Sequence, residues 1–284
     1  MGKIKALFEL TKPRALIVIV FTTCASYLIA VTDSYNLLRL LHTAIGVAIA
    51  AGGSLALNQH MERDLDKKMA RTANRPIPSG RIKASEAFVF GMVTMVGGYV
   101  YLWFLVNPAC SLATLACGVS YLYMYTPLKL RSSFSSFVGA IPGGLLPIMG
   151  WVAARDRLEA GAWVLFVILF IWQIPHALII SMRFRKDYES VGMRQLPLVS
   201  KPSASRKQIV LNILVLVPVS LLPALLNMTE LIYPVVALVM GLVLFWQMTR
   251  YVMKDNEKNA RAAFLTLSIY LPLLLLAMYL DKPA

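Results

Sequence analysis

Residues 45–76 read IGVAIAAGGSLALNQHMERDLDKKMARTANRP, an apolar run that passes directly into three acids and then a series of bases. The apolar part belongs to a longer run at 38–58, and a helix needs about 20 mostly apolar residues to cross a membrane. The chain has 284 residues, of which 58% are hydrophobic and 15% charged, outside the usual range of soluble globular proteins. This stretch therefore predicts a membrane-spanning helix with a polar site at its end.

Similar apolar runs occur along the whole chain and predict an all-α polytopic membrane bundle, with residues 1–284 forming one domain. Two of the predicted connections are long, 59–86 and 183–207, and long loops in a compact bundle are usually functional. The nine predicted spans are 14–31, 38–58, 87–106, 108–126, 134–153, 161–182, 208–226, 231–251 and 262–280.

The bases decide the orientation of the bundle. Of the 28 Lys and Arg residues, 24 fall on the side of the predicted spans that carries the N-terminus. Because cytoplasmic loops are enriched in Lys and Arg, we expect a cytoplasmic N-terminus and a C-terminus on the other side. Both long loops then face the cytoplasm. The net charge of +14 is explained by topology, so nucleic acid is not an expected partner.

The acids are distributed differently. None of the 14 Asp and Glu residues falls in the middle of a predicted span. Proton-coupled transporters and ion pumps commonly carry ionisable groups at that depth. A membrane transporter is therefore a weaker alternative for this chain than a protein with a site at the membrane surface.

The acids after the second span have a helical spacing. If the helix continues past the membrane, Asn58, Glu62 and Asp66 lie at positions i, i+4 and i+8 and share one face, whereas Asp64 lies on the opposite side. Oxygen-bearing groups on one face suit Mg²⁺, which takes one or two carboxylates together with waters and substrate phosphates. The competing interpretation is a solvated, charged helix end.

The bases that follow suggest what the metal would serve. Lys67, Arg71 and Arg75 come directly after the acids, and Pro76 and Pro78 stiffen the backbone behind them. Acids that hold a metal next to bases that bind phosphate oxygens form a diphosphate site. The positive-inside signal alone is the alternative explanation for these bases.

Together these residues resemble the first signature of the UbiA superfamily of intramembrane prenyltransferases, in the form found in its heme O synthase branch. A second stretch, IWQIPHALIISMRFRKDYESVG at 171–192, resembles the W-Q-[IM]-P-H segment and the later Asp-Tyr pair of that branch. A third, YMYTPLKLRSSFSSFVGAIPGGLLPIMGW at 123–151, resembles its Tyr-Thr…Lys-Arg loop. The matching positions of the first stretch are Asn58, Glu62, Arg63, Asp64, Asp66, Met69, Arg71, Thr72, Arg75, Pro76, Pro78, Gly80, Arg81 and Ile82.

The resemblance implies a site that contains metal ligands, diphosphate ligands and a heme pocket. Quinone-type members carry D-x-x-x-D in the second long loop, where this chain has Arg183 and the single acid Asp187. The implied catalytic and metal-binding residues are Asn58, Glu62, Asp66 and Asp187, with Asp64 as a further metal ligand. The implied diphosphate ligands are Arg63, Lys67, Arg71, Arg75, Lys129, Arg131 and Arg183. The implied pocket residues are Tyr125, Trp172, Gln173 and His176.

The function implied by the resemblance is Mg²⁺-dependent transfer of a farnesyl group from farnesyl diphosphate to the vinyl group of heme b, which makes heme O. The lipid bilayer would be that of a bacterial inner membrane, with the site facing the cytoplasm, and heme A synthase or a terminal oxidase assembly pathway would be the expected partner. Three alternatives stay open: a UbiA-type prenyltransferase acting on a quinone precursor or other aromatic acceptor, a transporter, and an assembly factor without chemistry.

Overall fold

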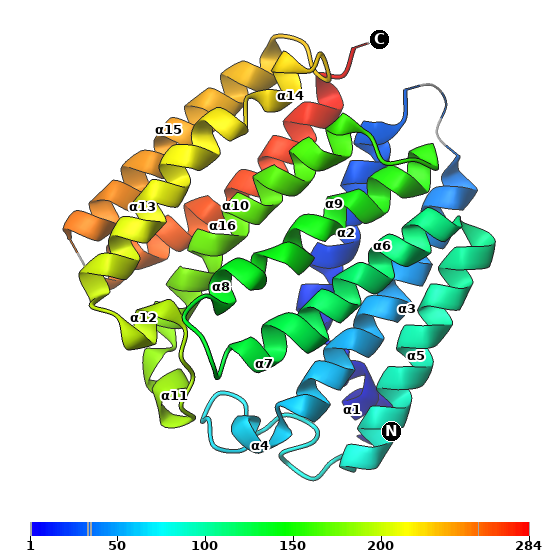
Figure 1. Cartoon of the computed structure of the whole chain (residues 1–284), viewed down its shortest axis with the longest axis vertical. Helices are drawn as coiled ribbons and strands as arrows, with labels where there is room; N and C mark the ends of the chain where they lie inside the picture. The colour runs from blue at the N-terminus through cyan, green and yellow to red at the C-terminus, as the bar shows by residue number, and fades with distance from the viewer. Residues whose placement is uncertain (1, 33, 35, 255, 284) are drawn as a thin grey trace.

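The computed structural model describes residues 2–32, 34, 36–254 and 256–283, which form helices joined by turns and loops (Figure 1). Within these residues, eight helical stretches have the length and hydropathy of a membrane span. The prediction of an all-α membrane bundle is confirmed. The eight stretches are α2 (Pro13–Ala30), α3 (Leu37–Met61), α5 (Ala84–Leu105), α8 and α9 (Ser135–Val138 and Ala140–Arg155), α10 (Ala160–Arg183), α13 and α14 (Pro202–Val219 and Leu222–Leu225), α15 (Ile232–Met253) and α16 (Glu257–Leu280).

The predicted span at 108–126 is built differently from the others. Here α6 (Pro108–Val119) passes directly into a π-helix, η1 (Ser120–Tyr125), and then into α7 (Thr126–Leu128). A hydropathy pattern does not report such a change in hydrogen-bond register, and π-turns occur frequently at functional sites. The segment is helical as predicted, but the count of nine spans stays a prediction.

Both long loops are shorter than predicted, because the helices before and after them extend beyond their apolar runs. The first loop covers 62–83 instead of 59–86, and the second covers 184–201 instead of 183–207. The polar residues at the helix ends continue the backbone hydrogen bonding of the spans, which hydropathy alone does not reveal. The loops themselves contain α4 (Arg63–Asp66), α11 (Arg185–Ser190) and α12 (Leu196–Val199).

The two long loops meet at one end of the bundle. In Figure 1, α4, α7, α11 and α12 gather at the lower end, where the N-terminal helix α1 (Gly2–Leu10) also lies, while α14 and the C-terminal end of α16 lie at the opposite end. A backbone hydrogen bond from Arg194 N to Lys129 O (2.8 Å) ties the second loop to the end of α7. Segments distant in sequence thus enclose a common region.

The helices α3 and α5 approach each other closely through glycines. A Cβ atom on Gly98 would lie 2.4 Å from the backbone nitrogen of Ala50, and one on Gly53 would lie 2.4 Å from the backbone nitrogen of Met95. Small residues at such contacts allow helix backbones in membranes to pack directly on one another. This contact fixes α3, the helix that carries Asn58 and ends just before Glu62.

The Gly98→Ala variant is expected to be less stable by about 1–3 kcal/mol, because the added methyl group overpacks the contact between α3 and α5. The matched control is Gly97→Ala, since a Cβ atom there meets nothing within 4 Å. Denaturant titration of the two variants in detergent measures the difference in their free energies of unfolding. Equal stability of the two variants would contradict the close contact.

Candidate active site

Three oxygen-bearing side chains are buried at the end of α3. Asn58 lies in the last turn of α3, Glu62 is the residue after that helix, and Asp66 ends α4. The backbone nitrogens of Glu62 and Asp66 donate to the carbonyl oxygens four residues earlier, at 3.0 and 2.8 Å, so the helical spacing continues across the break. The three residues are 1%, 8% and 0% exposed. Carboxylates buried to this extent require charged or hydrogen-bonding partners.

Those partners are bases from three separate segments. Lys129, which follows α7, forms an ion pair with Glu62. Arg75 Nη1 donates to both carboxylate oxygens of Asp66, at 2.8 and 2.6 Å. Lys12, in the turn between α1 and α2, donates from Nζ to Asn58 Oδ1 at 2.8 Å. We refer to these six residues as the acid–base cluster: Lys12, Asn58, Glu62, Asp66, Arg75 and Lys129.

The charged groups of the cluster shift one another's pKa values. Burial raises the pKa of Glu62, but the ammonium groups of Lys129 and Lys12 outweigh it and hold that pKa below its usual range. Burial disfavours the charged form of Lys129, yet Glu62 raises its pKa above the ordinary value. Burial and the guanidinium of Arg75 lower the pKa of Lys12 to about 7. The Glu62–Lys129 pair is therefore charged at neutral pH.

Thr126, the first residue of α7 directly after the π-helix η1, orients Asn58. The side-chain nitrogen Nδ2 of Asn58 donates to Thr126 Oγ1 at 3.1 Å, and Thr126 Oγ1 donates to the carbonyl oxygen of Tyr121 at 2.8 Å. With its nitrogen engaged, Asn58 directs the oxygen Oδ1 toward the rest of the acid–base cluster. Outer partners of this kind commonly orient metal-binding side chains.

Thr126→Val is expected to lower turnover by about 10-fold to 100-fold, because the amide of Asn58 loses the group that fixes its orientation. The matched control is Thr266→Val in α16, where the hydroxyl group donates to the carbonyl oxygen of Ala262 in the same helix. Steady-state turnover by the two variants checks this. Equal turnover would remove the orienting role of Thr126.

The first loop also contacts the second. The guanidinium carbon of Arg71 lies 4.8 Å from the ring centroid of Phe184 and 5.9 Å from that of Tyr188 in α11. The guanidinium carbon of Arg183 lies 5.7 Å from the ring centroid of Phe184. Asp187 is half-buried, and in the sequence it lies between Phe184 and Tyr188. The predicted two halves of the site therefore come together at this end of the bundle.

Several predicted site residues lie outside the acid–base cluster. The Asp64 side chain is 81% exposed and pairs with Arg63 at 3.7 Å, and Arg63 also donates to the carbonyl oxygen of His60 at 2.8 Å. Lys67 and Arg131 are exposed. Across the described parts of the chain, no three His, Cys, Asp or Glu residues are placed to hold a metal ion, so Asp187 does not form such a group with Glu62 and Asp66.

The predicted pocket residues lie on α10 and η1. Trp172 donates from Nε1 to the carbonyl oxygen of Leu267 at 2.9 Å, and its ring stacks on His176 with 4.8 Å between centroids. Nδ1 of His176 is buried and has no hydrogen-bond partner among the residues described. Gln173 packs against Gly143 of α9, and the ring centroid of Tyr125 lies 4.8 Å from Lys129 Nζ.

Sequence reasoning missed two residues of this site, Lys12 and Thr126. Lys12 belongs to the segment TKPR at 11–14, which is part of the same family resemblance, but it was not among the predicted site residues. Thr126 follows Tyr125 directly in the third matched stretch. In both cases the signal was present in the matched stretches, but the contact to Asn58 spans 46 or 68 residues and follows from the fold alone.

The donor set fits a magnesium ion. Asn58, Glu62 and Asp66 offer only oxygen atoms, which Mg²⁺ prefers, and this ion is usually held by one or two carboxylates with waters and substrate phosphates. The orientation of Asn58 by Thr126 leaves Oδ1 directed into the cluster. Two buried carboxylates and one amide oxygen would hold the ion, and phosphate oxygens would complete its coordination.

Known proteins are similar to this chain over nearly its whole length. The sequence profile of the UbiA prenyltransferase family matches residues 19–270. A protoheme IX farnesyltransferase from Solibacter usitatus is 42% identical over 97% of this chain and 98% of that protein. One from Opitutus terrae is 39% identical over 99% of this chain and 96% of that protein. A UbiA homologue from Archaeoglobus fulgidus bound to GPP and Mg²⁺ shares the fold, with a TM-score of 0.71 at 15% identity over 97% of this chain and 98% of that one.

These matches bear directly on the residues described above. The part matched by the family profile includes the whole acid–base cluster except Lys12, and the two relatives extend over nearly all of this chain. The family predicted from the sequence is therefore confirmed, and this chain belongs to the UbiA prenyltransferase family.

Proposed function

We propose that this chain transfers the farnesyl group of farnesyl diphosphate to a vinyl group of heme b, which gives heme O. The observation that carries the prenyl-transfer part is the acid–base cluster, in which buried Glu62 and Asp66 each hold a base at the end of an apolar bundle. The acceptor is supported by the relatives from Solibacter usitatus and Opitutus terrae, both protoheme IX farnesyltransferases.

The residues of the cluster would exchange partners when substrate binds. Asn58, Glu62 and Asp66 would hold Mg²⁺, which when bound neutralises charge that develops on the diphosphate as its C–O bond breaks. Arg75 and Lys129, now paired with the two carboxylates, would then donate to phosphate oxygens. Arginine and lysine both bind phosphate well, the former through its planar fork of donors. We propose that Arg71, which contacts the rings of Phe184 and Tyr188 in the second loop, binds the same anion.

The apolar interior of the bundle suits the second half of the reaction. A farnesyl cation that forms beside the cluster would be kept from early quenching by water. The heme vinyl group would donate its π electrons to C1 of the farnesyl cation, forming a C–C bond and leaving a cation on the heme side chain. Addition of one water and loss of one proton then complete the hydroxyethyl-farnesyl product.

The heme is proposed to lie against α10. His176 carries a buried Nδ1 without a hydrogen-bond partner among the described residues, and its ring lies between Trp172 and the Phe264 ring of α16 (centroids 4.8 and 5.6 Å away). Such a nitrogen is costly to leave unpaired. Axial ligation of heme iron or a hydrogen bond to a propionate would satisfy it, and Gln173 on the neighbouring face would also line the pocket.

The proposed setting is a bacterial inner membrane with the acid–base cluster on the cytoplasmic side. The excess of Lys and Arg on that side supports this orientation. We also propose that the chain is one domain with nine spans, the ninth being formed by α6, η1 and α7. The position of α1 and of the C-terminal end of α16 at opposite ends of the bundle agrees with an odd number of crossings (Figure 1).

An acceptor competition tests the function. Purified protein receives farnesyl diphosphate, Mg²⁺ and an equimolar mixture of heme b and an aromatic quinone precursor, and the products are resolved by mass spectrometry. We expect a farnesylated heme and no prenylated quinone precursor. Prenylation of the quinone precursor alone would assign the chain to another acceptor class within the family.

A further inference from the structure

The turn between α1 and α2 holds a lysine in an unusual backbone conformation. Lys12 has φ 48° and ψ 67°, in the left-handed region. Among the residues that the structure describes, the other non-glycine residues with positive φ are Asp156 and Asn227, the types that tolerate this region best. Glycine is the usual residue where a helix ends in this conformation. A lysine at such a position suggests that its side chain has a role, since strained residues concentrate at functional sites.

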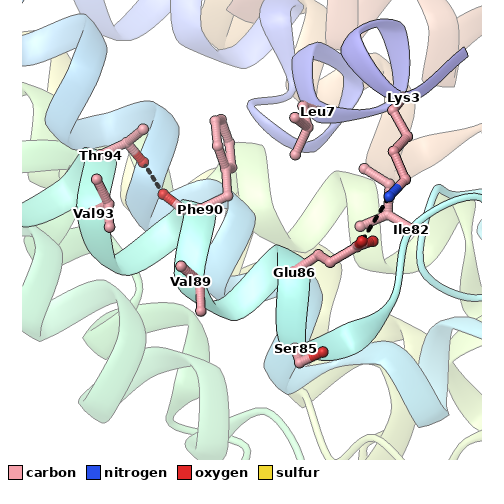
Figure 2. A pocket seen from close by; sticks show the side chains of 9 residues that line it. All are labelled: Lys3, Leu7, Ile82, Ser85, Glu86, Val89, Phe90, Val93 and Thr94. Atoms are coloured by element: carbon pink, nitrogen blue, oxygen red, sulfur yellow. Dashed lines mark hydrogen bonds and ion pairs between the residues drawn. The ribbon is translucent and has the colours of Figure 1, made fainter.

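Polar contacts from α1 to three other segments hold this turn in place. Gln59 of α3 donates from Nε2 to the carbonyl oxygen of Leu10 at 2.9 Å, and Glu9 pairs with Arg81 of the first loop at 2.6 Å. Figure 2 shows the third contact, in which Lys3 of α1 meets Glu86 of α5 at 2.7 Å, and both residues line a pocket. The backbone of Lys12 is therefore fixed relative to the acid–base cluster.

The hydrogen bond between Lys12 and Asn58 involves a group that a metal ion would bind and a group that a diphosphate would bind. Its ammonium group donates to Oδ1 of Asn58, the oxygen proposed as a magnesium ligand. Arg75 and Lys129, the other two cations of the cluster, are each paired with a carboxylate. Lys12 differs from them because its partner is a neutral amide, so a phosphate oxygen would be the stronger acceptor for it.

We propose that Lys12 is a diphosphate-binding residue, whose ammonium group leaves Asn58 Oδ1 and donates to a phosphate oxygen when substrate and metal bind. This inference rests on the proposed function and adds to it a cation from the α1–α2 turn. The movement frees Asn58 Oδ1 for the metal at the same step that the diphosphate arrives. Three cations from three segments then surround the leaving group.

Binding of inorganic pyrophosphate to the purified full chain, measured by calorimetry in the presence of Mg²⁺, tests this proposal. Lys12→Ala removes the ammonium group and keeps a Cβ in the left-handed conformation, whereas Lys12→Gly removes both. We expect both variants to bind pyrophosphate about 10-fold to 100-fold more weakly, which is the usual range for loss of a charge-assisted hydrogen bond. Lys12→Arg should stay within about 5-fold of the parent protein, because it keeps the charge.

Two controls separate this inference from the proposed function. Arg14→Ala removes an exposed base two residues away and should leave the affinity unchanged, while Arg75→Ala should weaken it. Loss of affinity in Arg75→Ala with unchanged affinity in both Lys12→Ala and Lys12→Gly would overturn the role of Lys12 alone. Parent-like binding by Lys12→Gly with weak binding by Lys12→Ala would show a backbone effect and likewise overturn it. Failure of the folded parent protein to bind pyrophosphate would overturn the proposed function as well.

Discussion

With Asp66 replaced by asparagine, turnover of farnesyl diphosphate is expected to fall by about 1,000-fold, or about 4 kcal/mol of transition-state stabilisation. Asp66 is fully buried and its carboxylate accepts two hydrogen bonds from Arg75, so the variant keeps a side chain of the same shape that can still accept from that guanidinium. It loses the negative charge that would hold the metal. Initial rates of diphosphate release, together with gel filtration to confirm folding, measure the effect.

Asp64→Asn is the matched comparison, because the same substitution two residues earlier alters a side chain that is 81% exposed. Its expected loss is far smaller than that of Asp66→Asn. A salt bridge between exposed groups, such as the one between Asp64 and Arg63, contributes little stability. Equal losses in the two variants would contradict the placement of Asp64 outside the acid–base cluster.

Removal of divalent metal ions is expected to reduce turnover by more than about 1,000-fold, and added Mg²⁺ should restore it. Without a cation between them, Glu62 and Asp66 would repel the diphosphate, and Lys129 and Arg75 would stay paired with the carboxylates. A bound divalent ion is commonly the largest local charge in such a site. Undiminished turnover by the folded protein in excess chelator would contradict the assignment of a metal site.

A binding measurement tests the same exchange of partners without relying on activity. Binding of Mg²⁺ to the carboxylates would free the bases for diphosphate, and binding of diphosphate to the bases would free the carboxylates for Mg²⁺. Each ligand should therefore raise the affinity for the other, and by the same factor. We expect Mg²⁺ to bind about 10-fold to 100-fold more tightly in the presence of pyrophosphate, within the usual range of coupling between sites. Independent binding of the two would contradict the exchange.

The bundle and its acidic face could be predicted because they depend on local sequence. Apolar runs of span length require helices in lipid, and the spacing of Asn58, Glu62 and Asp66 places them on one face wherever the helical hydrogen bonding continues. The structure keeps that hydrogen bonding through the break at Glu62. It also explains the difference between Asp64 and Asp66, which the helical spacing assigned to opposite sides.

The identity of the bases in the site could not be predicted in the same way. Lys67, Arg75 and Arg131 are equivalent as loop charges in the sequence, yet Arg75 is paired with Asp66 while Lys67 and Arg131 are exposed. Only tertiary contacts distinguish them. Lys12 is the clearest example, since the positive-inside pattern accounts for its charge, and its contact with Asn58 depends on how α1 packs against α3 and α5.

The π-helix η1 could not be predicted from the sequence for a different reason. Residues 108–126 carry no charged side chain and have the length of one span, and hydropathy does not distinguish a π-turn from an α-turn. The π-turn places Thr126 Oγ1 where it accepts from Asn58, so a change in backbone hydrogen bonding contributes to the site. Such a feature follows from packing of the whole bundle and not from the residues of one segment.

The most direct measurement of the central claim compares the parent protein with Asp66→Asn when each is given heme b, farnesyl diphosphate and Mg²⁺. Heme products are identified by mass spectrometry, and pyrophosphate is quantified in the same samples. We predict that the parent protein forms a heme heavier by one farnesyl group and one hydroxyl group, with one pyrophosphate released for each, and that Asp66→Asn forms almost none. Absence of the heavier heme with folded parent protein, or equal yields from the two proteins, would contradict the account.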